Sequence, residues 1–425
     1  HHPGRRGAPR WRAAVAAAAA AVVIVVLGAL VATGAWAPGG GPGGDQVGGT
    51  GRTATGPTTG PRARPDGSPT SGVGTGSRPG SRARSGSPDG SASSGPPATS
   101  VPPRATALPA SSVPSGSPAP SGSPVLTPSR HVGVASFTFL DRSRSRRLVV
   151  DVLYPARSGP PAAATPASTP ASPATDQAGL PLPAGAAPGA PPLGGRHPLV
   201  VFAPGYDVSP AFYSSLLEGW ARAGYVVAAV VFPHTNPSSS PLVPGDLVNQ
   251  PADVIFVISA LVSADETGSG LLRGLLDPLA VGVAGHSDGA ETMAAVAYAS
   301  CCRDVRVRAA VIMAGAEIPM SRGGYFPPGS PPLLVVQGTA DRPYVKALDA
   351  KLYAADGGPK YLLRLLGGTH TSPVHGPGPD LSVVEATTVD FFDAELAGRA
   401  GASARLRSDG NRPGVSTLTA AHLSP

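Results

Sequence analysis

The sequence predicts an α/β fold from about residue 131 onward, with a mostly parallel sheet covered by helices on both faces. The first observation behind this prediction is that short apolar runs, typical of buried strands, alternate with segments whose apolar residues recur at helical spacing. The second is that one apolar run, residues 279–284, leads through a short glycine-flanked turn straight into a helical pattern that starts at Glu291. Parallel strands require connections of this kind.

The predicted domain opens with two apolar segments, residues 132–139 and 147–154, on either side of a charged turn. Their apolar residues cluster or alternate as in an antiparallel hairpin, which Pro155 ends. Residues 158–196 then form a stretch rich in Pro and Ala. We expect this stretch to be a disordered, low-complexity insertion at the surface.

Strands and helices alternate regularly after this insertion. In the first helix, Ser209 and Pro210 supply an N-cap and a first-turn proline, and Gly224 ends the helix. Only residues 315–332 separate two core strands where a cap could be inserted, so no large cap domain is expected. The domain is expected to end at about residue 398, which leaves 399–425 as a C-terminal tail. Strands are predicted at residues 199–203, 225–232, 279–284, 307–314, 333–337 and 361–366, and helices at residues 209–224, 251–262, 291–302, 345–355 and 381–396.

The N-terminal segment, residues 1–37, has the pattern of a targeting segment. Four arginines precede an uncharged run rich in Ala and Val at residues 13–35, which is typical of an export signal or a membrane anchor. The run reaches the roughly 20 residues that span a bilayer, and Pro38 would follow the bond that a signal peptidase cuts. Both features favour an uncleaved transmembrane helix, with a cleaved signal sequence as the alternative. In either case the rest of the chain lies outside the cytoplasm, membrane-anchored or secreted.

Residues 38–130 consist almost entirely of Gly, Ser, Pro, Thr and Ala with scattered Arg. Such a composition cannot bury enough apolar surface to offset the loss of chain entropy, so we expect a disordered tether. Before His131 there are twelve Arg and three Asp, a surplus of nine positive charges, and the whole chain carries +7. The remainder therefore carries −2, and nothing in it predicts a nucleic-acid partner. We expect a monomer.

The two cysteines of the chain, Cys301 and Cys302, are adjacent. Neighbouring Cα atoms lie about 3.8 Å apart, which is below the usual range for a disulfide. We therefore favour two small, unpaired side chains at a helix end over a vicinal disulfide. Oxidising surroundings would make the disulfide more plausible.

A candidate nucleophile lies in the turn that follows the strand at residues 279–284. Residues 285–289 read Gly-His-Ser-Asp-Gly, with Ser287 at the apex of the turn. A sharp strand-to-helix turn exposes a serine hydroxyl, and the glycines on both sides let strand and helix approach without a Cβ clash. The pentapeptide is a weak signal in a chain rich in Gly and Ser, but the strand before it and the helix after it favour a nucleophile elbow.

A serine nucleophile needs a carboxylate and an imidazole base, which in such hydrolases follow the serine in the order acid, then His. Asp341 and His370 each come just after one of the last two predicted strands. Because the carboxyl ends of parallel strands meet at one edge of a sheet, we expect both side chains at the edge that carries Ser287. His375 is the rival base, but it lies farther from its strand, so we favour His370.

Such a site also needs two backbone N–H donors for the negative charge that develops on the substrate oxygen. One is expected from Asp288, directly after the nucleophile, and the other from Tyr206, in the loop after the strand at residues 199–203. His286 should point away from the site and fill space beside the turn. The remaining histidines show no metal-ligand spacing, so we expect neither a metal nor another cofactor.

Four segments together resemble the α/β-hydrolases: residues 199–206 (Leu-Val-Val-Phe-Ala-Pro-Gly-Tyr), 285–289 (Gly-His-Ser-Asp-Gly), 338–341 (Gly-Thr-Ala-Asp) and 368–370 (Gly-Thr-His). Within that superfamily the chain is similar to the branch of chlorophyllase-like, dienelactone-hydrolase-like and platelet-activating-factor-acetylhydrolase-like esterases. Residues 147–155 resemble the lead-in strand of the acetylhydrolase-like members. The resemblance covers about residues 131–398 and implies Ser287, Asp341 and His370 as a catalytic triad.

The chain departs from this branch at two positions. Dienelactone hydrolases use a cysteine where this chain has Ser287, which disfavours their substrate, and Pro204 stands where many relatives carry His. The sequence therefore predicts an extracytoplasmic serine esterase for small-molecule or polymeric esters. Two alternatives stay open: a catalytically silent fold used as a tethered binding module at the cell surface, and a peptidase that uses the same triad. The presence of all three residues in the expected order favours an enzyme.

Overall fold

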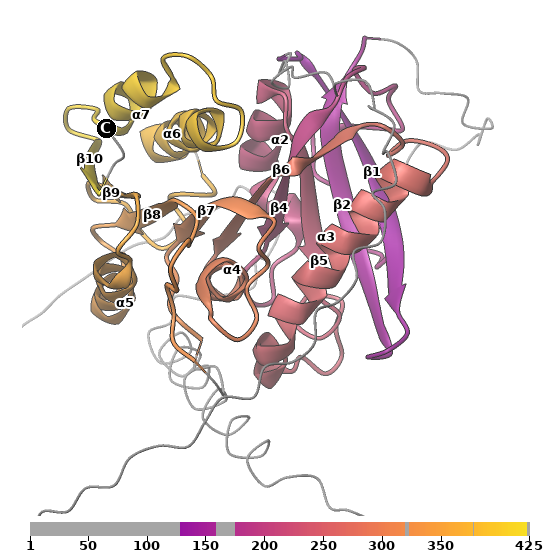
Figure 1. Cartoon of the computed structure of the whole chain (residues 1–425), viewed down its shortest axis with the longest axis horizontal. Helices are drawn as coiled ribbons and strands as arrows, with labels where there is room; N and C mark the ends of the chain where they lie inside the picture. The colour runs from indigo at the N-terminus through magenta and orange to yellow at the C-terminus, as the bar shows by residue number, and fades with distance from the viewer. Residues whose placement is uncertain (1–127, 159–174, 319–322, 377, 423–425) are drawn as a thin grey trace, which may run out of the picture. The chain divides into compact units, whose positions relative to one another are not determined.

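A computed structural model describes residues 128–158, 175–318, 323–376 and 378–422 (Figure 1). The predicted N-terminal membrane segment and the predicted tether lie outside the described residues. Within them, strands and helices alternate over most of the chain, as the sequence predicts.

The strands form one sheet in the order β10-β9-β8-β7-β6-β4-β5-β2-β1-β3. Six neighbouring strands pair in parallel, in the order β9-β8-β7-β6-β4-β5. At the two sides of this group, β10 pairs antiparallel with β9 and β2 pairs antiparallel with β5. The parallel strands are buried along nearly their whole length, which explains their continuous apolar sequences. The bounds are β1 His131–Asp141, β2 Arg146–Ala156, β3 Ala187–Pro188, β4 His197–Ala203, β5 Val226–Val231, β6 Leu276–His286, β7 Val307–Met313, β8 Leu333–Gly338, β9 Lys360–Leu365 and β10 Ser416–Ala421.

Helices cover both faces of this sheet (Figure 1). On one face lie α2 (Ser214–Ala223) and α6 (Pro379–Glu395), with α7 (Ala402–Gly410) against α6; on the other lie α3 (Gln250–Thr267), α4 (Asp288–Tyr298) and α5 (Pro343–Ala355). The 3₁₀ helices η1 (Pro210–Tyr213) and η2 (Pro244–Asn249) precede α2 and α3. A large apolar core lies between each helix layer and the sheet. The predicted α/β class is confirmed, and the arrangement is an α/β-hydrolase fold.

The connection between β7 and β8 is short, as predicted. Its described parts, residues 314–318 and 323–332, contain no helix. There is thus no large cap domain over the carboxyl ends of the strands at this point in the described chain.

The predicted C-terminal boundary is wrong, because residues 399–421 belong to the domain. Leu406 of α7 is fully buried, and Arg405 makes ion pairs with Asp390 and Asp393 of α6. β10 pairs with β9 as an edge strand of the sheet. Since most side chains of this edge strand are partly or fully exposed, its sequence lacks the apolar pattern of a buried strand.

The predicted low-complexity insertion is also shorter than residues 158–196. Residues 175–196 are described; β3 pairs with β1, and Leu180 packs against Val149 and Val231. Residues 159–174 lie outside the described chain. A few apolar side chains among many prolines are enough to hold this segment against the sheet.

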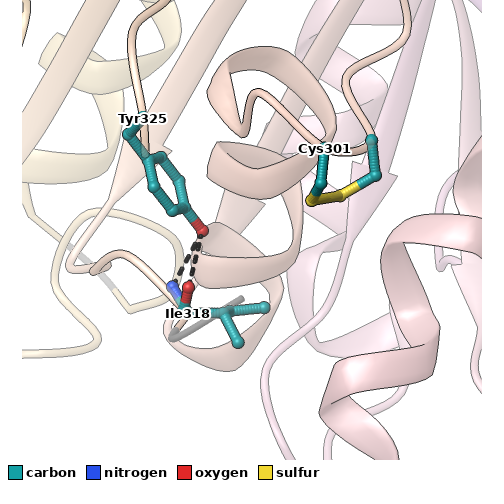
Figure 2. The surroundings of a disulfide bond; sticks show 4 residues. Cys301, Ile318 and Tyr325 are labelled. Atoms are coloured by element: carbon teal, nitrogen blue, oxygen red, sulfur yellow. Dashed lines mark hydrogen bonds between the residues drawn. A yellow bond between two sulfur atoms is a disulfide. The ribbon is translucent and has the colours of Figure 1, made fainter. Parts of the chain in front are cut away.

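Cys301 and Cys302, just after α4, form a vicinal disulfide (Figure 2). The prediction of two unpaired thiols is therefore wrong. Cys301 is exposed, whereas Cys302 is half-buried near Ile318 and Tyr325. The Tyr325 hydroxyl accepts a hydrogen bond from the backbone N–H of Ile318 and donates one to its carbonyl oxygen (Figure 2). The disulfide thus lies beside the β7–β8 connection.

One helical stretch of the described chain, Pro244–Thr267, is long and apolar enough to cross a membrane. Its residues Val254, Val257 and Leu261 are fully buried in the core that includes the sheet. This stretch is therefore a core helix. The membrane segment predicted at residues 13–35 lies outside the described residues.

Ending the chain at Gly398 is expected to destabilise the domain. The truncation removes Arg405, the ion-pair partner of Asp390 and Asp393. It also removes the buried side chain of Leu406 and the strand β10 that covers the edge of β9. Loss of one buried leucine costs about 2 kcal/mol and an uncompensated buried carboxylate about 3 kcal/mol more, so thermal unfolding should occur about 10 °C lower. A chain that ends at Ala421 is the control; equal melting temperatures for the two chains would contradict the assignment.

Candidate active site

Ser287 joins the end of β6 to the start of α4 in a backbone conformation that residues other than glycine rarely adopt, with φ 56° and ψ −126°. Its N–H donates a hydrogen bond to the carbonyl of Met313 in β7, and its carbonyl accepts from the N–H groups of Ala290 and Glu291. These bonds hold the turn so that the serine side chain lies at the carboxyl end of the parallel strands.

The two glycines of the motif are required by close backbone contacts. A Cβ atom on Gly285 would collide with the backbone of Gly289, and a Cβ atom on Gly289 would collide with the carbonyl oxygen of Ala203 in β4. Because neither backbone can move without separating helix from sheet, a side chain at either position would displace the turn. The interpretation of residues 285–289 as a tight strand-to-helix turn is confirmed.

The structure brings Ser287, His370 and Asp341 into one hydrogen-bonded chain. The distance from Oγ of Ser287 to Nε2 of His370 is 3.1 Å, and the distance from Nδ1 of His370 to Oδ2 of Asp341 is 2.8 Å. Asp341 and His370 come from the loops after β8 and β9, which are joined by backbone hydrogen bonds such as that from Ala340 N–H to the Gly368 carbonyl. Three strand ends thus supply the three groups.

The side chain of Asp341 is only 1% exposed, whereas that of His370 is 22% exposed. Burial by itself raises the pKa of Asp341, but the hydrogen bond and charge of His370 and the N–H of Arg342 outweigh it, so its pKa is lowered. The carboxylate therefore stays ionised and accepts the Nδ1–H of His370. This fixes the tautomer in which Nε2 is free to accept the proton of Ser287.

The loop after β4 lies against the nucleophile. A Cβ atom placed on Gly205 would come within 3.3 Å of the Cβ of Ser287. In the part of the chain that the structure describes, the N–H groups of Tyr206 and Asp288 donate no hydrogen bond to a protein acceptor. Neither predicted donor is thus engaged by a protein acceptor in the described chain.

His286 was expected to fill space, but it connects three parts of the site. Its Nε2 lies 2.8 Å from the carbonyl oxygen of His370, and its Nδ1 lies 3.2 Å from the hydroxyl of Tyr213. That hydroxyl accepts the N–H of Gly205 at 2.9 Å. No sequence pattern indicates this connection, because Tyr213 has the spacing of an ordinary core residue.

The directions of these bonds follow from their partners. A carbonyl oxygen can only accept, so Nε2 of His286 carries the hydrogen, and Nδ1 accepts the hydroxyl hydrogen of Tyr213. Burial, and secondarily the charge of His370, lower the pKa of His286 to about 3. His286 is therefore neutral and holds the His370 loop to the loop after β4.

His375, the rival base in the sequence, lies elsewhere. Its Nδ1 is 3.0 Å from the carbonyl oxygen of Phe212, and its ring stacks on the Phe212 ring with 4.1 Å between centroids. Among the described residues, no group of three or more His, Cys, Asp or Glu side chains could hold a metal ion.

A small pocket opens beside the nucleophile. It is lined by Ser287, Asp288, Glu291, Ala314, Gly315, Tyr344, Val345, Leu348 and His370. Glu291 was not among the predicted site residues. A pattern of helix periodicity places it in the first turn of α4, but only the folded chain shows that this turn faces the pocket.

Comparisons with known proteins identify no family for this chain. No family model matches it, and no curated protein sequence matches it. Among solved structures, a ferulic acid esterase from Streptomyces cinnamoneus is 23% identical, with a TM-score of 0.48, over 63% of this chain and 91% of that chain. At this level of similarity, any functional assignment rests on the geometry of this chain itself.

Replacing His286 with Gln is expected to change how stability depends on pH. The pKa of this histidine is about 3 in the folded chain, against 6.5 for an ordinary histidine, so only the unfolded chain takes up its proton between these pH values. Wild-type stability should therefore fall relative to His286→Gln as the pH drops from 7 to 5, by up to about 2 kcal/mol.

Denaturant unfolding of both proteins at pH 7, 6 and 5 measures this difference. The neighbouring residues Asp288, Asp341 and His370 are the same in both proteins, so their contributions largely cancel. A difference in unfolding free energy that stays constant with pH would contradict the neutral, buried state of His286.

Proposed function

We propose that this chain is a serine hydrolase that cleaves carboxylic esters, with Ser287 as nucleophile, His370 as general base and Asp341 as the group that orients it. The observation that carries this proposal is the hydrogen-bonded chain from the Ser287 hydroxyl through both ring nitrogens of His370 to the Asp341 carboxylate. The strained backbone of Ser287 supports it, since such strain is found where a side chain must be held exposed for reaction.

In the first half of the reaction, Nε2 of His370 takes the hydroxyl proton of Ser287 as Oγ attacks the ester carbonyl carbon. The carbonyl oxygen becomes an oxyanion, for which the N–H groups of Asp288 and Tyr206 are the proposed donors. His370 then gives its proton to the leaving alcohol oxygen as the ester C–O bond breaks. An acyl group remains on Ser287.

In the second half, His370 takes a proton from water as the water oxygen attacks the acyl carbon. The tetrahedral intermediate collapses with return of that proton to Oγ, which releases the carboxylic acid and restores Ser287. Throughout, the Asp341 carboxylate stabilises the positive charge that His370 acquires, which its low pKa and its burial support.

The short β7–β8 connection favours soluble or surface-bound esters over lipids that need a mobile cap. We further propose that the domain works outside the cytoplasm, anchored by the apolar segment at residues 13–35 or secreted after its cleavage. The disulfide between Cys301 and Cys302 supports this location, because disulfides persist mainly in oxidising compartments.

Ser287→Ala is expected to reduce kcat on a short-chain nitrophenyl ester by at least about 10³-fold, because no other hydroxyl can take its place in the hydrogen-bonded chain. The same variant should lose labelling by a fluorophosphonate, which the wild-type protein should show. Absence of an adduct on wild-type Ser287 would favour the tethered binding module instead, and hydrolysis of peptides faster than esters would favour a peptidase.

His370→Gln and His375→Gln form a matched pair that tests the choice of base. His370→Gln should lower kcat by at least about 10³-fold, since glutamine cannot accept and return the proton. His375→Gln should retain wild-type kcat within about twofold, because its ring packs on Phe212 away from Ser287. Comparable losses in both variants would overturn the assignment of His370.

A further inference from the structure

The pocket beside Ser287 has two carboxyl groups in its lining, those of Asp288 and Glu291 in the first turn of α4. Asp288 is 8% exposed and Glu291 is 9% exposed, so each is more than nine-tenths buried. The ester chemistry proposed above uses only the backbone N–H of Asp288 and does not use Glu291. These two side chains therefore need a separate explanation.

Neither carboxyl group has a hydrogen-bond or ion-pair partner in the part of the chain that the structure describes. Among the described residues, no hydrogen bond or ion pair involves either side chain. Tyr344 also lines the pocket, and its hydroxyl is buried without a hydrogen-bond partner in the described chain. Three residues with polar side chains thus line one small pocket, and none of these side chains has a hydrogen-bond or ion-pair partner among the described residues.

A structural role for these acids is too weak to explain their burial. Acidic residues in the first turn stabilise a helix by about 0.3–1 kcal/mol each, and they do so while exposed to water. A buried polar group without a partner costs about 1–3 kcal/mol, and a charged group costs more. Both side chains are more than nine-tenths buried, and their carboxyl oxygens are open only towards the pocket, so the pocket has the properties of an incomplete binding site.

We propose that Asp288 and Glu291 form a subsite for a small ammonium group carried by the ester substrate. A cation entering the pocket would supply the missing charge, and its N–H groups match the three unpaired acceptors of Asp288, Glu291 and Tyr344. This inference rests on the proposed esterase function and narrows its substrate class to amino esters.

The rest of the pocket suits a small group. Ala314, Val345 and Leu348 contribute apolar walls. Gly315 is held by its N–H, which donates to the buried carboxyl of Asp349 at 3.0 Å, and a Cβ atom on Gly315 would come within 2.6 Å of the Cβ of Ala290. The wall facing α4 is thus fixed close to the two carboxyl groups.

The electrostatics point the same way. Burial raises the pKa of Asp288 to about 6, against the opposing charge of His370, and burial together with the charge of Asp288 raises the pKa of Glu291. Both shifts show that negative charge in the pocket is insufficiently stabilised by the protein. Binding of a cation would relieve both.

Three nitrophenyl esters of nearly equal size test the subsite in the full-length protein. Their acyl groups are 3-aminopropanoyl, 3-hydroxypropanoyl and butanoyl, so the terminal group is an ammonium, a hydroxyl or a methyl. Each kcat/KM at pH 7 is divided by the spontaneous hydrolysis rate of the same ester. A second set, the 2-aminoethyl, 2-hydroxyethyl and propyl esters of butanoic acid, places the same groups on the alcohol side.

The wild-type protein should prefer the ester with the terminal ammonium over the ester with the terminal methyl group by about tenfold or more in at least one set. Glu291→Gln, which keeps the shape and removes the charge, should reduce that preference by about tenfold. Glu317→Gln is the matched control. Glu317, on the β7–β8 connection, pairs with Lys351 of α5 and does not line the pocket, so the preference should be unchanged.

Equal rates for the three groups in both sets, or an ammonium preference that survives Glu291→Gln, would overturn the subsite. If the hydroxyl ester is preferred as strongly as the ammonium ester, the pocket recognises a hydrogen-bonding group and not a charge. That outcome would also overturn the subsite. For both variants, the rate on the esters that end in a methyl group is the internal reference against which the ammonium preference is measured. If the wild-type protein hydrolyses none of the six esters, the proposed esterase function itself fails.

Discussion

The site depends on the contact between the turn at Ser287 and the strands beside it. Gly289 approaches the carbonyl oxygen of Ala203 so closely that no side chain fits, and Gly285 is equally constrained by Gly289. In this turn Ser287 has a positive φ of 56°, a strained state that persists because the surrounding sheet and helix hold it. The position of the Ser287 hydroxyl, the direction of α4 and the position of the Asp288 N–H all depend on this one turn.

A buried network joins the loops around this turn. His286, the residue next to the nucleophile, accepts from Tyr213 and donates to the carbonyl of His370, while Tyr213 also binds the N–H of Gly205. The loop of the base and the loop of the proposed oxyanion donors are therefore held to the same neutral imidazole. Because the low dielectric of the interior makes each unpaired group costly, the network favours one arrangement of both loops.

The first turn of α4 contributes both to the proposed ester hydrolysis and to the proposed ammonium subsite. It contains Asp288, whose N–H is a proposed oxyanion donor, and both acidic residues that line the pocket. A substrate cation near these carboxyl groups would be held by charge while its ester carbonyl lies beside Ser287. The vicinal disulfide just after this helix, and the Tyr325 contacts to Ile318, lie at the other end of the same element, next to the β7–β8 connection that contributes Gly315 to the pocket.

The sequence by itself determined the α/β class, most strand and helix positions to within a few residues, and the placement of Ser287, Asp341 and His370 at one sheet edge. It could do so because buried parallel strands have continuous apolar sequences and because the order of strands puts their following loops together. It failed at β10 and at residues 175–196, where exposed or proline-rich segments pack at sheet edges, and at Cys301 and Cys302. Only the tertiary structure decided that His286 connects two loops, that Glu291 faces the pocket and that His375 stacks on Phe212, because the direction of a side chain depends on neighbours distant in the chain.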